Sequence, residues 1–471
     1  EFDLAAGVGK DGRLLAKDMH SYSNQGAYAS HGHAIAANGL TSWRLQYACP
    51  NIRGEAYTIY TNTPVGGAMR GYGIPQVCFA IESFMDDVAN EIHMDPLEFR
   101  RKNLIQGYYE DAYLKPIAAN TNGIFECLEK GAEYIHWDEK RKEYAEQAGD
   151  VRKGVGMALF SYKTGVWPIS LEIAGARLSL NQDGSVQLML GATEIGQGAD
   201  TVFSQMVAET LHTDMEHVHI KTVQDTDVSP FDTGAYASRQ SFVTGTAVRH
   251  CAEILRDKIL AYAKTLLPEI DTRELTLKDN WIWAGDEQAI SLAALAEESY
   301  YSLTNSSVLT AEVSEQVKKN TIATGCCFAE VEVDIKLGKI KILHIINVHD
   351  SGKLLNPQLA EMQVHGGMSM GMGYGISEQL ILDEKTGRPL NGNLLDYKLM
   401  TMLDTPDIKA DFVELCDPMG PYGNKALGEP PAIPCAPAIR NAVLHATGVA
   451  FYENPLTPQR LIDGFKKAGL I

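Results

Sequence analysis

The sequence lacks several patterns that would fix its class at once. It has no run of 18 apolar residues, the length a helix needs to cross a membrane, so we expect no membrane span. Its 41 Lys and Arg residues are outnumbered by 60 Asp and Glu residues, and no basic stripe with interleaved aromatics is present. The resulting formal net charge of −19 repels phosphate backbones, which argues against nucleic-acid binding.

The eight cysteines also lack a ligand pattern. None is spaced as CxxC, and Cys326 and Cys327 are adjacent, which is a poor geometry for shared ligation. We therefore expect buried thiols in a reducing, cytoplasmic compartment and no iron–sulfur cluster on this chain. The chain begins at Glu1 without a charged and then apolar leader, so we expect a fragment or a processed product.

A chain of 471 residues is too long for one ordinary domain. We place a boundary near residue 150, which gives units 1–150 and 151–471. Residues 1–75 are predicted to form short strands and turns. The apolar spacing within 77–95 predicts a helix, and a shorter helix is expected near 96–103. Residues 104–150 are polar and mixed.

The second unit contains an approximate internal repeat. Residues 176–180 and 186–190 flank a turn sequence, and a glycine-rich turn and a helix through Val202 and Leu211 follow. Residues 329–335 and 340–348 flank Leu337-Gly338 in the same way, and a helix from about Leu359 follows. Two β-hairpin–turn–helix units predict an α+β fold with functional loops at corresponding ends of the two halves.

Two familiar motifs are weak here. Gly367-Met368-Ser369-Met370-Gly371 fits the GxSxG elbow of serine hydrolases, but that elbow needs a preceding strand, and 359–364 is predicted to be helical. The pairs Asp225/Asp227 and His31/His33 could chelate a metal from a strand, but neither has a third ligand at a recognisable spacing. Solvated turns are the simpler interpretation of both pairs.

Three other segments are ambiguous when taken singly. Residues 191–198 form a glycine-rich turn before a helix, where backbone N–H groups can cradle a ligand, but the turn has neither GxGxxG nor a P-loop lysine. Residues 232–240 are small and hydroxylated, which suits either a ligand loop or a surface loop. In 425–431, two prolines fix the chain after Glu429, so this carboxylate is either a base with a raised pKa or an ordinary surface residue.

The order of these segments carries a resemblance. Residues 193–198 (TEIGQG), 237–240 (ASRQ) and 428–431 (GEPP), with 69–76 (MRGYGIPQ) upstream, are similar to the xanthine dehydrogenase family. The likeness runs along the whole chain and is greatest to the molybdenum subunits of bacterial three-subunit enzymes. It implies the α+β molybdenum-cofactor-binding fold of that family, with 1–150 as the C-terminal part of a first molybdopterin-binding domain and 151–471 as a second.

The resemblance also implies a cofactor site, in which the pterin holds the molybdenum and no protein ligand is direct. Its expected residues are Arg70 beside the molybdenum, Gly196, Gln197 and Gly198 on the pterin, and Ala237, Ser238, Arg239 and Gln240 at the dithiolene end. Whether the pterin carries a cytosine nucleotide is left open.

On the substrate side, Tyr72 matches an aromatic residue that stacks on a flat ring, and Val166 and Trp167 would line the opposite wall. Glu429 matches the base that activates a water-derived oxygen for addition to an electron-poor carbon. The substrate expected is a purine such as xanthine or hypoxanthine. The alternatives are another N-heterocycle, an aldehyde, or a catalytically silent cofactor-binding subunit. Eukaryotic xanthine enzymes have a substrate-binding arginine between the segments that match Tyr28 and Tyr47. Only Arg44 lies there in this chain, and not in clear register, which weakens the case for xanthine itself.

Two features of the family are missing from this chain. The GGxFGGK segment of the N-terminal molybdenum domain does not occur, so we expect that segment elsewhere. Electrons must also leave the site, which implies partner subunits carrying [2Fe–2S] clusters and FAD, with a dimer of heterotrimers as one possible assembly.

Overall fold

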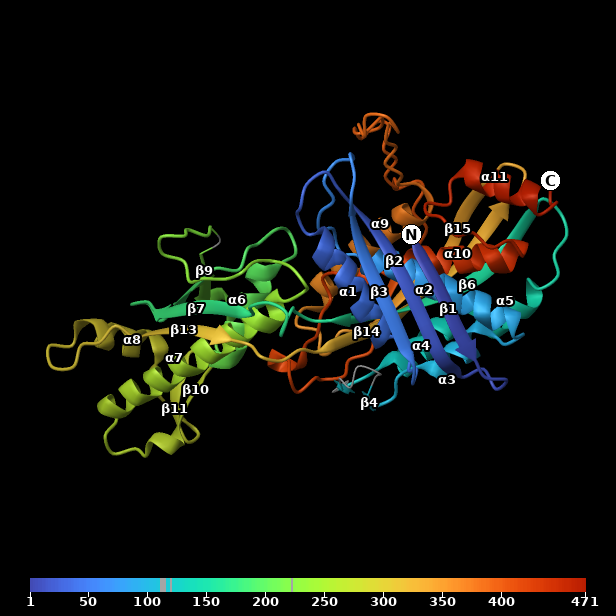
Figure 1. The fold of residues 1–471 in the computed structure, drawn as a ribbon. Helices are drawn as coiled ribbons and strands as arrows, with labels where there is room; N and C mark the ends of the chain where they lie inside the picture. Colours follow the sequence, from blue (N-terminus) through green and yellow to red (C-terminus); the bar gives the residue numbers. More distant parts are fainter. Residues whose placement is uncertain (111–115, 119–120, 222) are drawn as a thin grey trace.

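A computed structural model describes residues 1–110, 116–118, 121–221 and 223–471, which form two lobes (Figure 1). The N-terminal part of the larger lobe contains β1 (Phe2–Val8), β2 (Leu14–Gly26), α1 (Gly32–Leu45), β3 (Ile52–Tyr60), α2 (Ile74–Glu91), α3 (Pro96–Asn103), β4 (Tyr108–Glu110), β5 (Pro116–Ala118), α4 (Ile124–Ile135), α5 (Trp137–Glu143) and β6 (Val151–Lys163). Its C-terminal part contains β14 (Ile322–Asp334), β15 (Lys339–Asp350), α9 (Pro357–Ile376), β16 (Ile408–Phe412), α10 (Cys435–Thr447) and α11 (Pro458–Lys467).

The smaller lobe, green to yellow in Figure 1, is built from the middle of the chain. It contains β7 (Ile173–Leu180), β8 (Val186–Leu190), α6 (Ala199–Leu211), β9 (Val218–Ile220), α7 (Gly245–Leu266), β10 (Leu275–Lys278), β11 (Trp281–Ala284), β12 (Glu287–Ser291), α8 (Leu292–Tyr301) and β13 (Thr310–Gln316). Helices and strands are mixed throughout, so the α+β prediction is confirmed.

The main sheets of the two lobes share one topology. In the smaller lobe the order is β13-β7-β8-β9, and in the larger lobe it is β6-β14-β15-β16. Each sheet has an antiparallel central hairpin, and the strand that follows the helix, β9 or β16, lies parallel to the second strand of that hairpin. The predicted hairpin–turn–helix repeat is therefore confirmed as β7-β8-α6 and β14-β15-α9.

The edge strands are exchanged between the repeats. β6 precedes β7 in sequence but pairs with β14, and β13 precedes β14 but pairs with β7. The chain therefore crosses between the lobes twice, in segments 164–172 and 317–321, which we call the crossover pair. The two segments bond directly, because Thr164 N donates to Thr321 O at 2.8 Å and Val317 N donates to Glu172 O at 2.9 Å.

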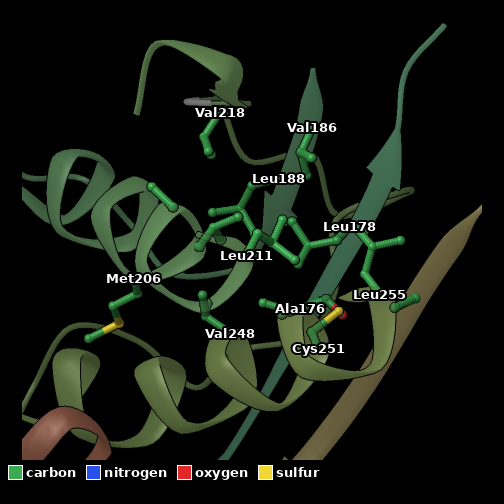
Figure 2. Close-up of a cluster of buried hydrophobic side chains, with 14 of the residues drawn as sticks. Ala176, Leu178, Val186, Leu188, Met206, Leu211, Val218, Val248, Cys251 and Leu255 are labelled. Atoms are coloured by element: carbon green, nitrogen blue, oxygen red, sulfur yellow. The ribbon is translucent and has the colours of Figure 1, made fainter. Parts of the chain in front are cut away.

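Each lobe has its own apolar core. In the smaller lobe, alternate residues of β7 and β8 point at α6 and α7. Figure 2 shows Leu178 of β7 and Leu188 of β8 in one apolar cluster with Leu255 of α7. In the larger lobe, α4 covers one face of the β6–β14–β15 sheet and α10 covers the other. Residues before 150 share a core with β6 and β14, and the division near residue 150 stays a prediction about the sequence units.

The helices predicted at 77–95 and 96–103 are present as α2 and α3, but two predictions were wrong. Residues 1–75 are not only strands and turns, because α1 is a 14-residue helix. Its sequence has little amphipathic pattern, and packing holds it: Trp43 is buried, and a Cβ at Gly39 would lie 2.5 Å from a Val77 methyl. The region 104–150 contains α4, whose buried residues Ile124, Leu128 and Ile135 carry a helical pattern that the sequence analysis missed.

Helix α9 carries a stripe of glycines at every fourth residue, which places Gly367, Gly371 and Gly375 on one face. A Cβ at Gly367 would come 2.4 Å from the Cβ of Pro431, and one at Gly371 would come 2.8 Å from the Cβ of Cys435. The missing side chains let the 429–436 segment lie directly against the helix. This contact fixes the backbone that bears Glu429.

We expect Gly367→Ala to lower the free energy of unfolding by about 1–3 kcal/mol, because the added methyl group overpacks this contact. The matched control is Gly366→Ala, whose Cβ would meet only the Arg70 guanidinium, at 3.7 Å. The control should be neutral or up to about 1 kcal/mol more stable, because alanine favours a helix over glycine. Urea unfolding monitored by circular dichroism compares the two, and equal effects would contradict the packing role of the stripe.

Candidate active site

The predicted site loops meet at the crossover pair. Gly165 N donates to Ala237 O at 2.9 Å, which ties the 237–240 loop to the first crossing segment. Ala426 N donates to the Thr164 hydroxyl at 3.0 Å, which ties the 425–431 segment to the same point. Loops separated by hundreds of residues are thereby held at one place.

The segment that bears Glu429 runs along the end of β15. Lys425 N donates to Ser351 O at 2.7 Å, and the Asn347 carboxamide donates to Pro431 O at 2.9 Å. Between these anchors, Glu429 N donates to the Ser238 hydroxyl at 2.9 Å. Two of the predicted site segments are therefore in direct contact.

The carboxyl group of Glu429 is strongly desolvated. Burial raises its pKa from 4.5 to about 7, and the positive charge of Arg70 and backbone hydrogen bonds from Ala237 and Gly71 offset only part of that rise. Its Oε2 atom is buried and has no hydrogen-bond partner among the described residues. A carboxyl with a pKa near neutrality can take up or release a proton at physiological pH.

Arg70 lies beside this carboxyl and is held by backbone carbonyls. Its Nε donates to Gly428 O at 2.6 Å, and its second guanidinium nitrogen donates to Gln363 O at 2.8 Å. Among the described residues, the one hydrogen-bond partner of the remaining nitrogen is the Met370 sulfur, at 3.8 Å. Burial lowers the pKa of Arg70, and the charge of Glu429 opposes that effect. Gln363 is a site neighbour that the sequence analysis missed.

Tyr72 is the third residue at this point. Its backbone is left-handed (φ 48°), and its hydroxyl lies 2.8 Å from Nδ1 of His31. Burial and the charge of Glu429 both raise its pKa, which places the ring near the carboxyl. His31 was considered as a metal ligand, but here it orients Tyr72.

The 193–198 turn meets the 237–240 loop through two carboxamides. The Gln197 side chain donates to the Gln240 side-chain oxygen at 2.6 Å, and both glutamines donate to Thr193 O. Gly196 and Gly198 have positive φ values of 95° and 87°, which glycine adopts without strain. The sequence predicted these residues separately, and the structure brings them together.

Within the 237–240 loop, the side chains divide their tasks. Ala237 and Ser238 are both left-handed, which turns the loop toward Glu429. Arg239 points the other way and is fully buried, with its Nε bonded to Glu172 at 2.5 Å and a terminal nitrogen bonded to Asp232 at 2.6 Å. Arg239 therefore shapes the loop from within. Its two carboxylate partners were not among the predicted site residues.

Val166 and Trp167 lie in the first crossing segment. Val166 N donates to Glu172 at 2.5 Å, and Lys163 donates to Trp167 O at 3.2 Å. Burial lowers the pKa of Lys163, Glu172 raises it, and the charge of Arg44 lowers it further. The substrate role of all these residues stays a prediction.

A histidine that the sequence analysis did not select lies under the Glu429 segment. His349 is fully buried against Phe160, with ring centroids 4.9 Å apart, and neither ring nitrogen has a hydrogen-bond partner among the described residues. Burial and the nearby charge of Arg70 lower its pKa to about 3. His349 is therefore neutral at physiological pH. A lone histidine in a β-rich run gives no sequence signal of this position.

The rival motifs do not form sites. Ser369 lies in the middle of helix α9 and not on a strand-to-helix elbow. Asp225 accepts from the backbone of Asp227 in a local turn. In the part of the chain that the structure describes, no group of three or more metal-binding side chains could hold an ion, and no helix is both long and apolar enough to cross a membrane.

Comparison with known protein families defines the class. Two family models, each described as a molybdopterin cofactor-binding domain, match residues 1–104 and 130–406. The second match alone covers more than half of the chain, and the chain therefore belongs to the molybdopterin cofactor-binding family.

Individual proteins agree with this assignment. The chain is 47% identical to the putative xanthine dehydrogenase molybdenum-binding subunit of Escherichia coli K12, over 100% of this chain and 62% of that protein. It is 31% identical to a probable hypoxanthine oxidase of the same strain, over 98% of this chain and 48% of that protein. The fold resembles quinoline 2-oxidoreductase from Pseudomonas putida 86, with a TM-score of 0.90, 23% identity, and coverage of 99% and 62%. The chain thus spans less than two thirds of the length of these relatives.

Because the pKa of Glu429 is raised, we expect the free energy of unfolding to depend on pH. Folding favours the protonated carboxyl, so its contribution to stability is complete below pH 4.5 and is lost as the pH rises through about 7. A rise from 4.5 to about 7 corresponds to roughly 3 kcal/mol. Glu429→Gln should therefore gain up to about 3 kcal/mol over the wild type between pH 4.5 and 8.

Urea unfolding at a series of pH values measures this difference. Glu287→Gln, on the exposed strand β12, controls for the removal of one carboxylate. A stability difference between Glu429→Gln and the wild type that stays constant with pH would mean that Glu429 is not desolvated.

Proposed function

We propose that this chain is the larger part of the molybdopterin-binding subunit of a purine dehydrogenase, which hydroxylates an electron-poor carbon of xanthine or hypoxanthine with oxygen from water. The observation that carries the proposal is the Glu429 carboxyl, which has a pKa of about 7 and a buried oxygen without a partner, beside the predicted cofactor loop. The names of the E. coli relatives support the purine as the substrate.

The residues present fit a molybdenum–molybdopterin cofactor. The orphaned Oε2 of Glu429 needs a polar partner, which a bound cofactor or substrate provides. Arg70 has one guanidinium nitrogen with only a sulfur contact, so it retains a donor for a ligand. Arg70, the turn Gly196–Gly198 and the 237–240 loop would hold the cofactor, either as the mononucleotide or as a cytosine dinucleotide. The cofactor supplies the two-electron oxidation when bound.

The residues of this chain prepare the proton step. Glu429, whose pKa is near neutrality, would accept at Oε2 the proton that the water-derived oxygen loses as it adds to the electron-poor substrate carbon. Ser238 and Arg70 hold the two ends of the one peptide unit that joins Gly428 to Glu429, at Glu429 N and Gly428 O, which fixes the backbone from which the Glu429 side chain extends. Tyr72, fixed by His31, offers a flat ring against which a heterocycle can stack. Val166 and Trp167 would form the facing wall.

The proposal requires further polypeptides. An iron–sulfur subunit with [2Fe–2S] clusters and an FAD subunit would accept the electrons, and a separate segment would complete the molybdenum domain. A dimer of such heterotrimers in the cytoplasm is the assembly we propose. The chain covers 62% of the E. coli molybdenum-binding relative, which leaves room for the additional segment.

The same machinery acting on another N-heterocycle or an aldehyde is the second candidate. The 47% identity to the E. coli putative xanthine dehydrogenase molybdenum-binding subunit favours the purine over these substrates. Dye reduction by the assembled complex with a panel of purines, nicotinate and aldehydes separates these substrates.

We expect Glu429→Gln in the assembled complex to lower turnover by about 10²–10⁴-fold, because the amide cannot accept the proton. Molybdenum and pterin contents should match those of the wild type, and Glu287→Gln should retain full activity. A silent cofactor-binding subunit would instead give unchanged turnover in Glu429→Gln. A purified complex without molybdenum or pterin would reject the proposal as a whole.

A further inference from the structure

The turn before helix α6 is built around a carboxylate of its own chain. Glu194 Oε1 accepts from Gly196 N at 2.7 Å and from Gly198 N at 3.1 Å, and its Oε2 accepts from Asp200 N at 3.1 Å. These are N–H groups at the start of a helix, where proteins commonly bind phosphate. Here an internal anion already occupies that position.

The charge of this carboxylate is stable. Burial raises the pKa of Glu194, but backbone hydrogen bonds from Asp200, Gly198 and Gly196 outweigh burial, so the pKa lies below its usual value. A second carboxyl, Asp200, has a buried oxygen without a partner among the described residues, and burial and Glu194 raise its pKa. A phosphate approaching this turn would meet negative charge and no free N–H donor from Gly196, Gly198 or Asp200.

The neighbouring carboxamides show what the turn can still bind. Gln197 uses both N–H bonds, on Thr193 O and on the Gln240 oxygen, and its own oxygen accepts from Ile195 N at 2.6 Å. Gln240 donates one N–H to Thr193 O, and its other N–H has no acceptor in the part of the chain that the structure describes. Each carboxamide oxygen also keeps one lone pair. One donor and two acceptors without charge suit the edge of a heterocyclic ring.

We propose that Glu194 is the positioning residue of this turn. Its carboxylate accepts the N–H groups at the start of α6 and fixes the glycine backbone, which holds Gln197 against Gln240. The turn can therefore bind the neutral ring part of the cofactor, and it excludes the phosphate. The inference rests on the proposed cofactor site. It goes further by naming Glu194 as the residue that holds the turn and keeps phosphate out of it.

The first test uses this chain and inorganic phosphate. Glu194→Ala frees the N–H groups at the start of α6, so phosphate should raise the melting temperature of the variant by several degrees and leave the wild type unchanged. Ser291→Ala removes the side-chain cap of α8 in the same lobe, where Ser291 Oγ accepts from Ala294 N at 3.1 Å. This control frees one N–H group at a helix start where Glu194→Ala frees three, so its phosphate response should be much smaller. An equal phosphate response in the wild type and Glu194→Ala would overturn the proposal.

The second test uses the assembled enzyme and measures pterin and molybdenum per protein after gel filtration. Glu194→Ala should lower cofactor retention about 10- to 100-fold, the range seen when a supporting partner of a bound group is removed. Formate, a small carboxylate, should restore retention in Glu194→Ala. Glu194→Gln, which keeps the shape but loses one acceptor, should show an intermediate loss without formate rescue.

Ser291→Ala should keep its cofactor, which separates the role of Glu194 from a general loss of stability in this lobe. Full retention in both Glu194 variants would overturn the inference and leave the proposed function standing. A wild-type complex without cofactor would instead reject the proposed function. The phosphate test would still show whether Glu194 keeps phosphate from the turn.

Discussion

The site depends on the pairing of two crossing segments. Thr164 and Thr321 bond where the chain passes between the lobes, and every predicted loop is tied to that point or to a neighbour of it. Gly165 holds the 237–240 loop, Thr164 holds the 425–431 segment, and Glu172 braces Arg239. Because each sheet takes its edge strand from the other repeat, neither repeat can complete its sheet alone, and the site loops are held where the chain crosses between the lobes.

The glycine stripe of α9 supplies the second constraint. It lets Pro431 and Cys435 approach the helix closely, so the 428–431 backbone is buried against α9. The same packing contributes to the desolvation of the Glu429 carboxyl. The Asn347 carboxamide donates a hydrogen bond to Pro431 O, so the backbone carbonyl of this closely packed residue has a partner. Packing thereby sets the chemistry, because desolvation is the main cause of the raised pKa of Glu429.

The sequence predicted features that have a local signal. Alternation in β7 and β8, the turn between them and the spacing in α2 each lie within one short window, and all were found. The exchange of β6 and β13 was not predictable in this way, because Val155 of β6 pairs with Glu330 and Val313 of β13 pairs with Ala176, residues far apart in the sequence. Helix α1 was missed because tertiary packing, not its own pattern, stabilises it. Arg239 was grouped with its loop and with Asp232 in segment 232–240, but its inward direction also depends on Glu172, which no motif connects to it.

Glu194 and Glu429 illustrate how one residue type acquires opposite properties at one site. Glu194 receives backbone N–H groups from a helix start, which stabilise the negative form and lower its pKa. Glu429 has an oxygen without a partner in a desolvated position, which destabilises the same form and raises its pKa to about 7. A permanently charged carboxylate suits the shaping of a turn, and a carboxyl that titrates near neutrality suits proton transfer. Glu194 is followed by Gly196 and Gly198, whose positive φ values let the turn fold back onto the carboxylate. Glu429 is followed by Pro430 and Pro431, which restrict the backbone. The neighbours in sequence therefore decide which environment each carboxyl can reach.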